Sequence, residues 1–166
     1  MALHLANMGF PVIVNYLSDK NAAEQTANEI INKGGQAELL PFDVSKPQEI
    51  IQALNSWEEH HPDDYIYILV NNAGIRKDNV MFMMSDEEWH NVLDTSLNGY
   101  FYTTRHLLKQ MMRKNHGGRI INITSLSGVK GLAGQVNYSS AKSALIGATK
   151  ALAQEVAIRN VTVNAV

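Results

Sequence analysis

The sequence predicts an α/β domain in which helices cover both faces of a parallel sheet. Short apolar runs typical of strands alternate with longer helical patterns from one end of the chain to the other. The connections between them are short, which favours right-handed strand–helix–strand units with parallel strands. Polar residues begin where several of these strands end. Because sheets of this kind bind ligands beyond the carboxyl ends of their strands, that edge is the candidate site.

Composition narrows the possible classes of protein. The 166 residues are 45% hydrophobic, which is enough for one core, so we expect a single domain over residues 1–166. A formal net charge of −2 gives no basic surface for nucleic acid or an anionic membrane. No apolar run approaches the ~20 residues that span a bilayer, and residues 1–10 contain no Lys or Arg to begin a signal peptide. We therefore expect a soluble, cytoplasmic protein.

The absence of cysteine excludes disulfide scaffolds, thiolate metal sites and cysteine nucleophiles. Composition alone is compatible with α/β, α+β and helical domains. The alternation of the elements along the chain favours the first of these.

The chain begins with the end of a helix, followed by a strand. Apolar residues over Ala2–Met8 are followed by Gly9, a residue that suits the position just after a helix. Pro11 then precedes the β-branched run Val12–Val14, which we expect to be a strand.

The next three elements are a helix, a strand and a helix. Apolar residues recur at helical spacing over Ala22–Ile31, and Gly34–Gly35 ends that helix. A strand over Ala37–Phe42 stops at Asp43. Proline suits the first turn of a helix, so we expect the following helix over Pro47–Trp57.

The middle of the chain contains a buried strand and a long helix. Tyr65–Val70 is continuously apolar, as expected for a strand covered on both faces, and it leads directly into Asn71–Gly74. Ser85–Glu88 fits the capping-box pattern at a helix start. The helical pattern continues to about Lys114, with an interruption or kink near Gly99.

The last part of the chain repeats the strand and helix alternation. Gly117–Gly118 closes the long helix, and a strand over Arg119–Thr124 ends at Ser125. A glycine-containing loop then leads to a helix over Tyr138–Arg159, and Val161–Val166 is the final strand.

Three groups of residues have side chains suited to chemistry on a carbonyl compound. Tyr138 and Lys142 lie four residues apart, so on a helix they share a face, where the ammonium would favour the phenolate and help the phenol deliver a proton. Asn71–Gly74 offers two amides that can point outward to a flat ligand lying on the backbone of the small residues. The Ser125 hydroxyl can hold a carbonyl oxygen. Taken singly, each group also has an ordinary structural interpretation. The Tyr138 and Lys142 pair fits a solvated helix face, Asn71–Gly74 fits an Asn/Gly turn, and Ser125 fits a helix cap.

The combination is more specific than its parts. Asn71–Gly74 is followed by Ser125, by Tyr138 thirteen residues later and by Lys142 four residues further on. In this the chain resembles the short-chain dehydrogenase/reductase family over essentially its whole length. The stretches most similar to the 3-oxoacyl-(acyl-carrier-protein) reductases of that family are Ile68–Ile75, Gly118–Ile123 and Asn137–Lys142.

The resemblance implies a Rossmann-type doubly wound parallel sheet and hydride transfer between a nicotinamide and a carbonyl group. Tyr138 would be the general acid. Lys142 would favour ionisation of that phenol and hold the nicotinamide ribose, while Ser125 would position the substrate oxygen. Ser96 stands where the family's catalytic set has an asparagine, and its hydroxyl can still hold a water molecule.

The same resemblance implies a nucleotide site. Asp43 and Val44 would face the adenine. Where NAD is preferred, an acidic residue after the second family strand binds the ribose hydroxyls and repels a 2′-phosphate. Here that position is Asn15, so we expect NADP(H). The full set expected to bind the cofactor is Asn15, Tyr16, Ser18, Asp43, Val44, Asn72, Ala73, Gly74, Tyr138 and Lys142.

Two further departures from the family pattern concern the ends of the chain. The first residues resemble the family's first helix, so the first strand and the glycine-rich turn that cradles the pyrophosphate are missing from these residues. The chain stops before the family's C-terminal strand. We therefore interpret residues 1–166 as an incomplete domain of an enzyme.

The function expected is NADPH-dependent reduction of a 3-oxoacyl thioester, carried by an acyl carrier protein, in fatty-acid or polyketide-type synthesis. A homo-oligomer, either a dimer or a tetramer, is expected. A reductase of sugars, polyols or steroid-like alcohols would use the same catalytic residues. A non-catalytic oligomerisation module is the alternative that the missing turn and Ser96 favour.

Two other groups of residues have less specific interpretations. His60 and His61 lack a third ligand at a suitable spacing, so no metal site is predicted. Met81, Met83 and Met84 are compatible with an acyl-chain pocket, with core packing or with a dimer contact.

Overall fold

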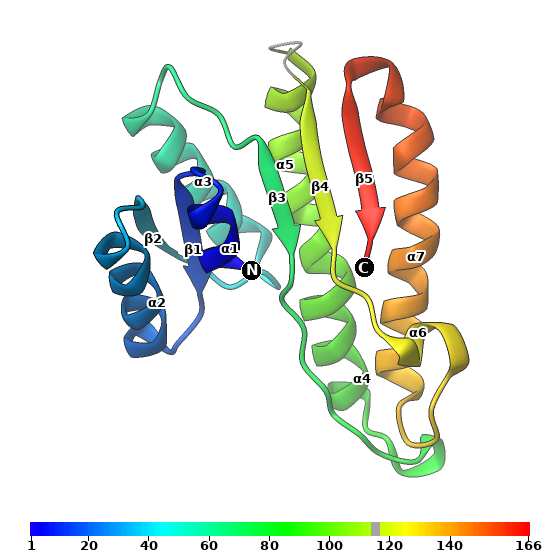
Figure 1. The fold of residues 1–166 in the computed structure, drawn as a ribbon. Coiled ribbons are helices and arrows are strands. Elements are labelled where there is room, and N and C mark those ends of the chain that lie inside the picture. The colour runs from blue at the N-terminus through cyan, green and yellow to red at the C-terminus, as the bar shows by residue number, and fades with distance from the viewer. Residues whose placement is uncertain (114–116) are drawn as a thin grey trace.

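The computed structural model describes residues 1–113 and 117–166 and shows the predicted alternation of helices and strands (Figure 1). The predicted helix end at Lys114 lies outside the described residues. In chain order the elements are α1 (Ala2–Asn7), β1 (Val12–Tyr16), α2 (Lys20–Asn32), β2 (Ala37–Pro41), α3 (Pro47–His60), β3 (Ile68–Asn71), η1 (Met81–Met83), α4 (Asp86–Leu93), η2 (Asp94–Asn98), α5 (Gly99–Arg113), β4 (Gly118–Asn122), α6 (Leu126–Lys130), α7 (Val136–Val156), η3 (Ala157–Arg159) and β5 (Val161–Ala165).

The strands form two parallel sheets. β1 pairs with β2, with Val12 opposite Ala37, and β4 lies between β3 and β5. In Figure 1 helices lie on both sides of the strands: α1 is in front of β1, and α5 is behind β4. The expected Rossmann-type architecture is therefore confirmed, and among the described residues no strand lies between β1 and β3, where the first family strand was expected to be missing.

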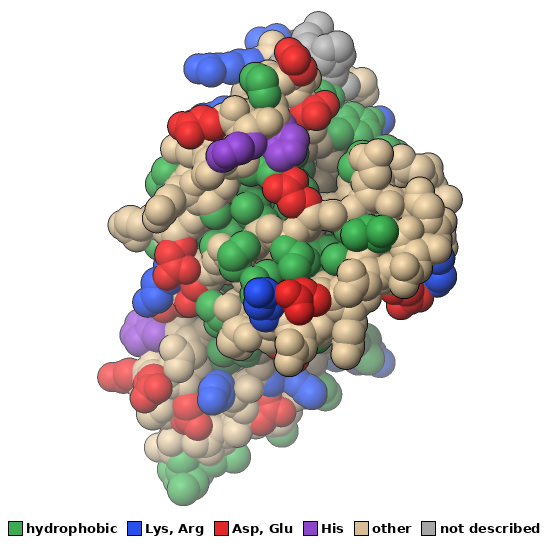
Figure 2. Space-filling model, turned by 90° about the vertical axis from the view of Figure 1, so that its left-hand side faces the viewer, with side chains coloured by type: hydrophobic (Ala, Val, Ile, Leu, Met, Phe, Trp, Pro, Cys, Tyr) green, Lys and Arg blue, Asp and Glu red, His purple; other side chains and the backbone are tan. Residues whose placement is uncertain are grey.

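A cavity of about 1160 Å³ separates β1 from β3. Its walls include the apolar side chains Val12–Val14 of β1 and Ile68–Val70 of β3. Figure 2, which views the molecule from the left-hand side of Figure 1, shows hydrophobic side chains exposed near the middle of that face. Both strands therefore present backbone donors and acceptors to a cavity whose wall is largely apolar.

The core joins the two sheets through helices. Ile50 of α3, Met111 of α5 and Ile120 of β4 are completely buried in one cluster. Phe42, which directly follows β2, belongs to the same cluster. The packing of α3 against α5 therefore holds the β1–β2 sheet to the rest of the molecule.

The long central helix contains the interruption that the sequence predicts near Gly99. The residues just before it, Asp94–Asn98, form a π-helical turn. A methyl group at Gly99 would lie 3.1 Å from Cβ of Val44, so the glycine allows this close contact. The predicted capping box is confirmed: Ser85 Oγ accepts a hydrogen bond from the Glu88 N–H (3.1 Å), and the Glu88 carboxylate accepts one from the Ser85 N–H (2.8 Å).

The bounds of several elements differ from the predicted ones by one to three residues, among them those of α3, β3, β4 and α7, and one short helix was not predicted. The strand expected over Tyr65–Val70 spans Ile68–Asn71. Ile68, the first residue of β3, pairs with Arg119, one residue after β4 begins at Gly118. The loop expected after Ser125 contains the short helix α6, which the glycine at position 128 had hidden in the pattern.

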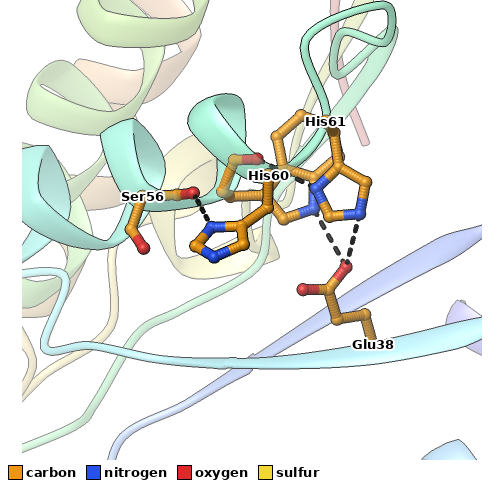
Figure 3. A network of polar contacts seen from close by, with 5 residues as sticks. Glu38, Ser56, His60 and His61 are labelled. Carbon is orange, nitrogen blue, oxygen red and sulfur yellow. Dashed lines mark hydrogen bonds and ion pairs between the residues drawn. The ribbon is translucent and has the colours of Figure 1, made fainter.

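The histidine pair at the end of α3 is held by local contacts (Figure 3). His60 Nδ1 lies 2.7 Å from the Ser56 carbonyl oxygen, and His61 Nε2 lies 3.5 Å from the carboxylate of Glu38 on β2. The Trp57 indole N–H donates to the same carboxylate. Within the described ranges, no group of three His, Cys, Asp or Glu side chains is arranged to hold a metal ion. In the same ranges, no helix has the length and apolar character needed to cross a bilayer.

Candidate functional site

The cavity between the two sheets reaches the carboxyl ends of the strands, where most of the predicted nucleotide-binding residues lie. Ser96 is part of its wall, whereas four other predicted site residues are not: Ser18, Ser125, Tyr138 and Lys142. The predicted cofactor residues that line the cavity are Asn15, Tyr16, Asp43, Val44, Asn72, Ala73 and Gly74. Residues that are far apart in sequence are thus brought to one edge of the fold.

Asn15 connects β1 to the end of β2. Its Nδ2 donates hydrogen bonds to the carbonyl oxygens of Leu40 and Phe42, both at 3.0 Å. Both amide protons are therefore used inside the protein. A carboxylate at this position would face two carbonyl oxygens with no proton to share, so the fold itself favours an amide here over an acid.

Asp43 is held by the turn that follows β2. Its Oδ1 accepts hydrogen bonds from the N–H (2.8 Å) and the hydroxyl (2.7 Å) of Ser45. The Asp43 N–H donates to the carboxylate of Glu49 at 2.9 Å. These contacts fix the segment that carries Asp43 and Val44 at the edge of the cavity.

The end of β3 shows that one prediction was wrong. The Asn71 amide was expected to point outward, but Nδ2 donates to Thr104 Oγ1 (3.1 Å) and Asn122 Oδ1 (2.9 Å). Asn122 in turn donates to Thr149 Oγ1 at 2.8 Å. This buried chain ties β3 and β4 to α5 and α7, so Asn71 is structural, while Asn72 and the two small residues after it are exposed.

Lys142 and Tyr138 lie on α7 one helical turn apart. Lys142 is only 3% exposed, and its Nζ donates to the carbonyl oxygen of Ile123 at 2.8 Å. Nζ also lies 5.7 Å from the centroid of the Tyr138 ring. Burial lowers the pKa of Lys142 below its usual value, because a charged ammonium loses its hydration there. The arrangement places a cation next to a phenol at the carboxyl edge of the sheet.

Gly74 and Ser96 lie next to that cation. A methyl group at Gly74 would be 3.3 Å from both Lys142 Nζ and Ser96 Oγ. Ser96 is 2% exposed, and its hydroxyl has no hydrogen-bond partner among the described residues. A buried hydroxyl without a partner is costly, so a polar group of a bound molecule or of water fits this position.

Ser125 caps the start of α6. Its Oγ accepts a hydrogen bond from the Ser127 N–H at 3.2 Å. α6 packs closely on α7 at Gly128, where a methyl group would lie only 2.7 Å from the carbonyl carbon of Lys142. The helix that begins at Ser125 is therefore placed directly against the part of α7 that carries Lys142.

Sequence reasoning did not identify Asn137 and Gln135, two buried polar residues at the start of α7. Gln135 joins Asp78 to Ser127 through its side chain, with contacts of 2.8 Å and 3.0 Å. These partners are distant in sequence, and no local pattern marks them. Only the motif that places Asn137 directly before Tyr138 could have drawn attention to it.

Comparison with known proteins is consistent with this geometry. The short chain dehydrogenase family matches residues 1–166. The chain is 44% identical over 165 residues to a 3-oxoacyl-(acyl-carrier-protein) reductase of Synechocystis sp., covering 99% of this chain and 66% of the relative. It is 42% identical to a protein of the same name from Aggregatibacter actinomycetemcomitans, covering all of this chain and 68% of the relative.

A solved structure gives the same result for the fold. The acetoin dehydrogenase from Enterobacter cloacae superposes with a TM-score of 0.91 at 34% sequence identity, covering 99% of this chain and 64% of that one. The chain thus spans about two-thirds of the length of the proteins it matches. With a family match over every residue and more than 40% identity to two relatives, the chain belongs to the short chain dehydrogenase family.

Proposed function

We propose that the protein carrying this chain is an NADPH-dependent reductase of 3-oxoacyl thioesters bound to an acyl carrier protein. The observation that carries the proposal is the buried Lys142 ammonium beside the Tyr138 ring, at the edge where the predicted nucleotide residues line the cavity. The similarity to two reductases of this name supports the substrate class. A place in fatty-acid or polyketide-type synthesis, in the cytoplasm, belongs to the same proposal.

The chemistry follows from three side chains. Tyr138 donates its phenolic proton to the carbonyl oxygen of the substrate, and the Lys142 ammonium stabilises the phenolate that remains. The Ser125 hydroxyl donates a hydrogen bond to the same oxygen and orients the carbonyl. A bound nicotinamide nucleotide supplies the hydride.

The residues present fit such a nucleotide. The exposed backbone of Asn72, Ala73 and Gly74 is accessible to a flat ligand. The Lys142 ammonium can bind its ribose, and the unpartnered Ser96 hydroxyl can hold a water molecule. The preference for NADPH rests on Asn15, because an amide lacks the charge that would repel a 2′-phosphate. Tyr16 and Ser18 follow it and would complete that part of the site.

A second candidate is a reductase of a small ketone or alcohol, which the structural similarity to an acetoin dehydrogenase favours. A homo-oligomer is proposed in either case. Phe101 on the outer face of α5 is 48% exposed, and an aromatic side chain of this size is more stable in a contact with another subunit.

The test is Tyr138→Phe in the purified full-length protein, measured by NADPH oxidation with a 3-oxoacyl thioester. Loss of a general acid lowers rates by ~10² to 10⁴-fold, so we expect kcat to decrease by a factor in that range. NADPH binding, followed by its fluorescence, should change little, and NADH should bind more weakly. Tyr102→Phe, on α5 outside the site, is the matched control and should keep wild-type kcat. Turnover retained by Tyr138→Phe would contradict the assignment, and faster turnover of small ketones than of thioesters would favour the second candidate.

A further inference from the structure

Asn137 is a polar side chain that the fold buries completely in the first turn of α7. An unpaired carboxamide in such a place would destabilise the protein. Each of its polar atoms has a partner instead. Oδ1 accepts from the Tyr138 N–H at 2.8 Å, and Nδ2 donates to the carbonyl oxygens of Lys77 (2.9 Å) and Glu88 (3.2 Å).

These partners come from separate parts of the chain. Lys77 lies in the segment between β3 and η1, and Glu88 lies in the first turn of α4. The Glu88 carboxylate is itself held by the backbone of Ser85 (2.8 Å) and by Asn79 Nδ2 (3.2 Å). Asn137 therefore fastens the start of α7 to two segments that are already ordered.

Backbone hydrogen bonds also hold the start of α7, from the Asn79 N–H to the Gly134 carbonyl oxygen (2.8 Å) and from the Ser139 N–H to the Gln135 carbonyl oxygen (2.7 Å). Gln135, at the N-cap position, makes no side-chain hydrogen bond to the helix backbone. Its side chain binds Asp78 and Ser127, so it orders the surrounding loop and α6 without contacting Tyr138. The contact that reaches the Tyr138 backbone from a side chain is made by Asn137.

The neighbours of Tyr138 have contacts of their own. The Ile123 carbonyl holds the Lys142 ammonium, and the Gly128 contact holds α6 and the Ser125 cap against α7. We propose that Asn137 is a positioning residue that sets where the Tyr138 ring lies relative to that ammonium and that hydroxyl. The inference rests on the proposed role of Tyr138 as the general acid.

Loss of the Asn137 hydrogen bonds should affect the rate of the reaction more than the binding of NADPH. Misplacement of a reacting group by about 1 Å can lower a rate by ~10²-fold. Most of the residues proposed to bind the nucleotide, including Asn72 and Asp43, line the cavity and lie outside the first turn of α7. Loss of the Asn137 contacts should therefore lower kcat and leave the KM for NADPH almost unchanged.

The experiment compares Asn137→Leu and Asn137→Ser with Thr149→Val in the full-length enzyme. Leucine removes all three hydrogen bonds with a side chain of similar size, and serine keeps a hydroxyl near the Tyr138 N–H. Thr149→Val removes two buried hydrogen bonds of a side chain on the same helix, one from Asn122 Nδ2 and one to the Leu145 carbonyl oxygen, two turns beyond Lys142, and is the matched control. All rates are measured at least ten degrees below the Tm of each variant, so that only folded protein is compared.

We expect kcat to fall by ~10 to 100-fold in Asn137→Leu and less in Asn137→Ser, with the KM for NADPH within about twofold of wild type. Thr149→Val should lower Tm but keep kcat. Wild-type kcat in either folded Asn137 variant would overturn the proposal, as would an equal loss of kcat in Thr149→Val. Tyr138→Phe is assayed alongside: if it is inactive while the Asn137 variants are normal, only this inference fails, whereas an active Tyr138→Phe removes the proposed function itself.

Discussion

The charge of Lys142, which is proposed to act in catalysis, lies in a location that is unfavourable for a charge. Its ammonium is nearly buried and keeps one hydrogen bond, to the Ile123 carbonyl. The lowered pKa means that the folded state binds this proton more weakly than the unfolded chain does. At neutral pH the charged side chain therefore destabilises the fold while it serves the proposed chemistry at Tyr138.

Replacing Lys142 by methionine should raise the free energy of unfolding at pH 7 while it abolishes reductase activity. The unfolded state binds the extra proton between the lowered pKa of the folded state and the ordinary value of 10.5, so wild-type stability rises with pH across that interval. The advantage of Lys142→Met should thus shrink as the pH approaches 10. Urea unfolding at several pH values measures this. Lys109→Met, at an exposed position on α5, serves as the control. If the stability gain of Lys142→Met over wild type did not change with pH, the gain would not come from the lowered pKa of Lys142.

Single residues also show how far the site was predictable. The Tyr138 and Lys142 pair was visible because a helix places residues four apart on one face, which is a local rule. The inward amide of Asn71 and the three contacts of Asn137 were not visible. Their partners lie up to 60 residues away, and only the assembled fold decides which side of the backbone a polar side chain faces.

At the scale of elements, the contact between α6 and α7 depends on one glycine. A Cβ at residue 128 would lie 2.7 Å from the Lys142 carbonyl carbon and 2.9 Å from its Cβ. Backbone and Cβ atoms cannot move aside as a flexible side-chain end can, so a larger residue would separate the two helices. Ser125, at the start of α6, would move with it.

Gly128→Ala should lower stability by ~1 to 3 kcal/mol and lower kcat as well, because overpacking shifts the helix that carries the Ser125 hydroxyl. Gly147→Ala is the matched control: it lies inside α7 with no neighbour within 4 Å of the added methyl group. That change should stabilise the helix by ~0.8 to 1 kcal/mol, because alanine is the better helix former. Thermal unfolding measures the stability of both variants, and steady-state kinetics measures their kcat. If Gly128→Ala kept a normal kcat, the position of α6 would not affect the proposed reaction.

Elements were more predictable than their contacts. The order of helices and strands, the Ser85 capping box and the interruption before Gly99 all follow from local patterns of apolar residues, caps and glycines. Strand ends were less predictable, since the start of β3 depends on where β4 begins. The short helix α6 was hidden because its five residues include a glycine and too few apolar positions to show a helical period.

At the scale of the whole molecule, the parallel sheet is divided into a two-stranded and a three-stranded part. The cavity between them is lined by apolar side chains of β1 and β3 and by Met1, Ala2 and Leu5 at the chain start. An extended segment joined ahead of α1 would enter this cavity through a right-handed crossover and run parallel to both strands. It would pair with two free edges at once.

Adding an apolar segment as long as β1, with a short turn, ahead of residue 1 should merge the two sheets and raise Tm. Each new ladder hydrogen bond contributes ~1 kcal/mol, and the apolar lining gains further by leaving water. Amide hydrogen exchange should show new protection in Val12–Tyr16 and Ile68–Asn71. The same segment with alternating lysines is the control and should protect neither strand. Equal protection by both segments would contradict strand insertion.

The polar edges of β1 and β3 have a further consequence for the behaviour of the chain in concentrated solution. Two neighbouring strands with free backbone donors and acceptors can be extended by a strand from another copy as readily as by one from the same chain. Whenever the cavity is not filled from within, the molecule exposes a template for aggregation. A strand from the same molecule and a strand from another copy would therefore compete for these edges.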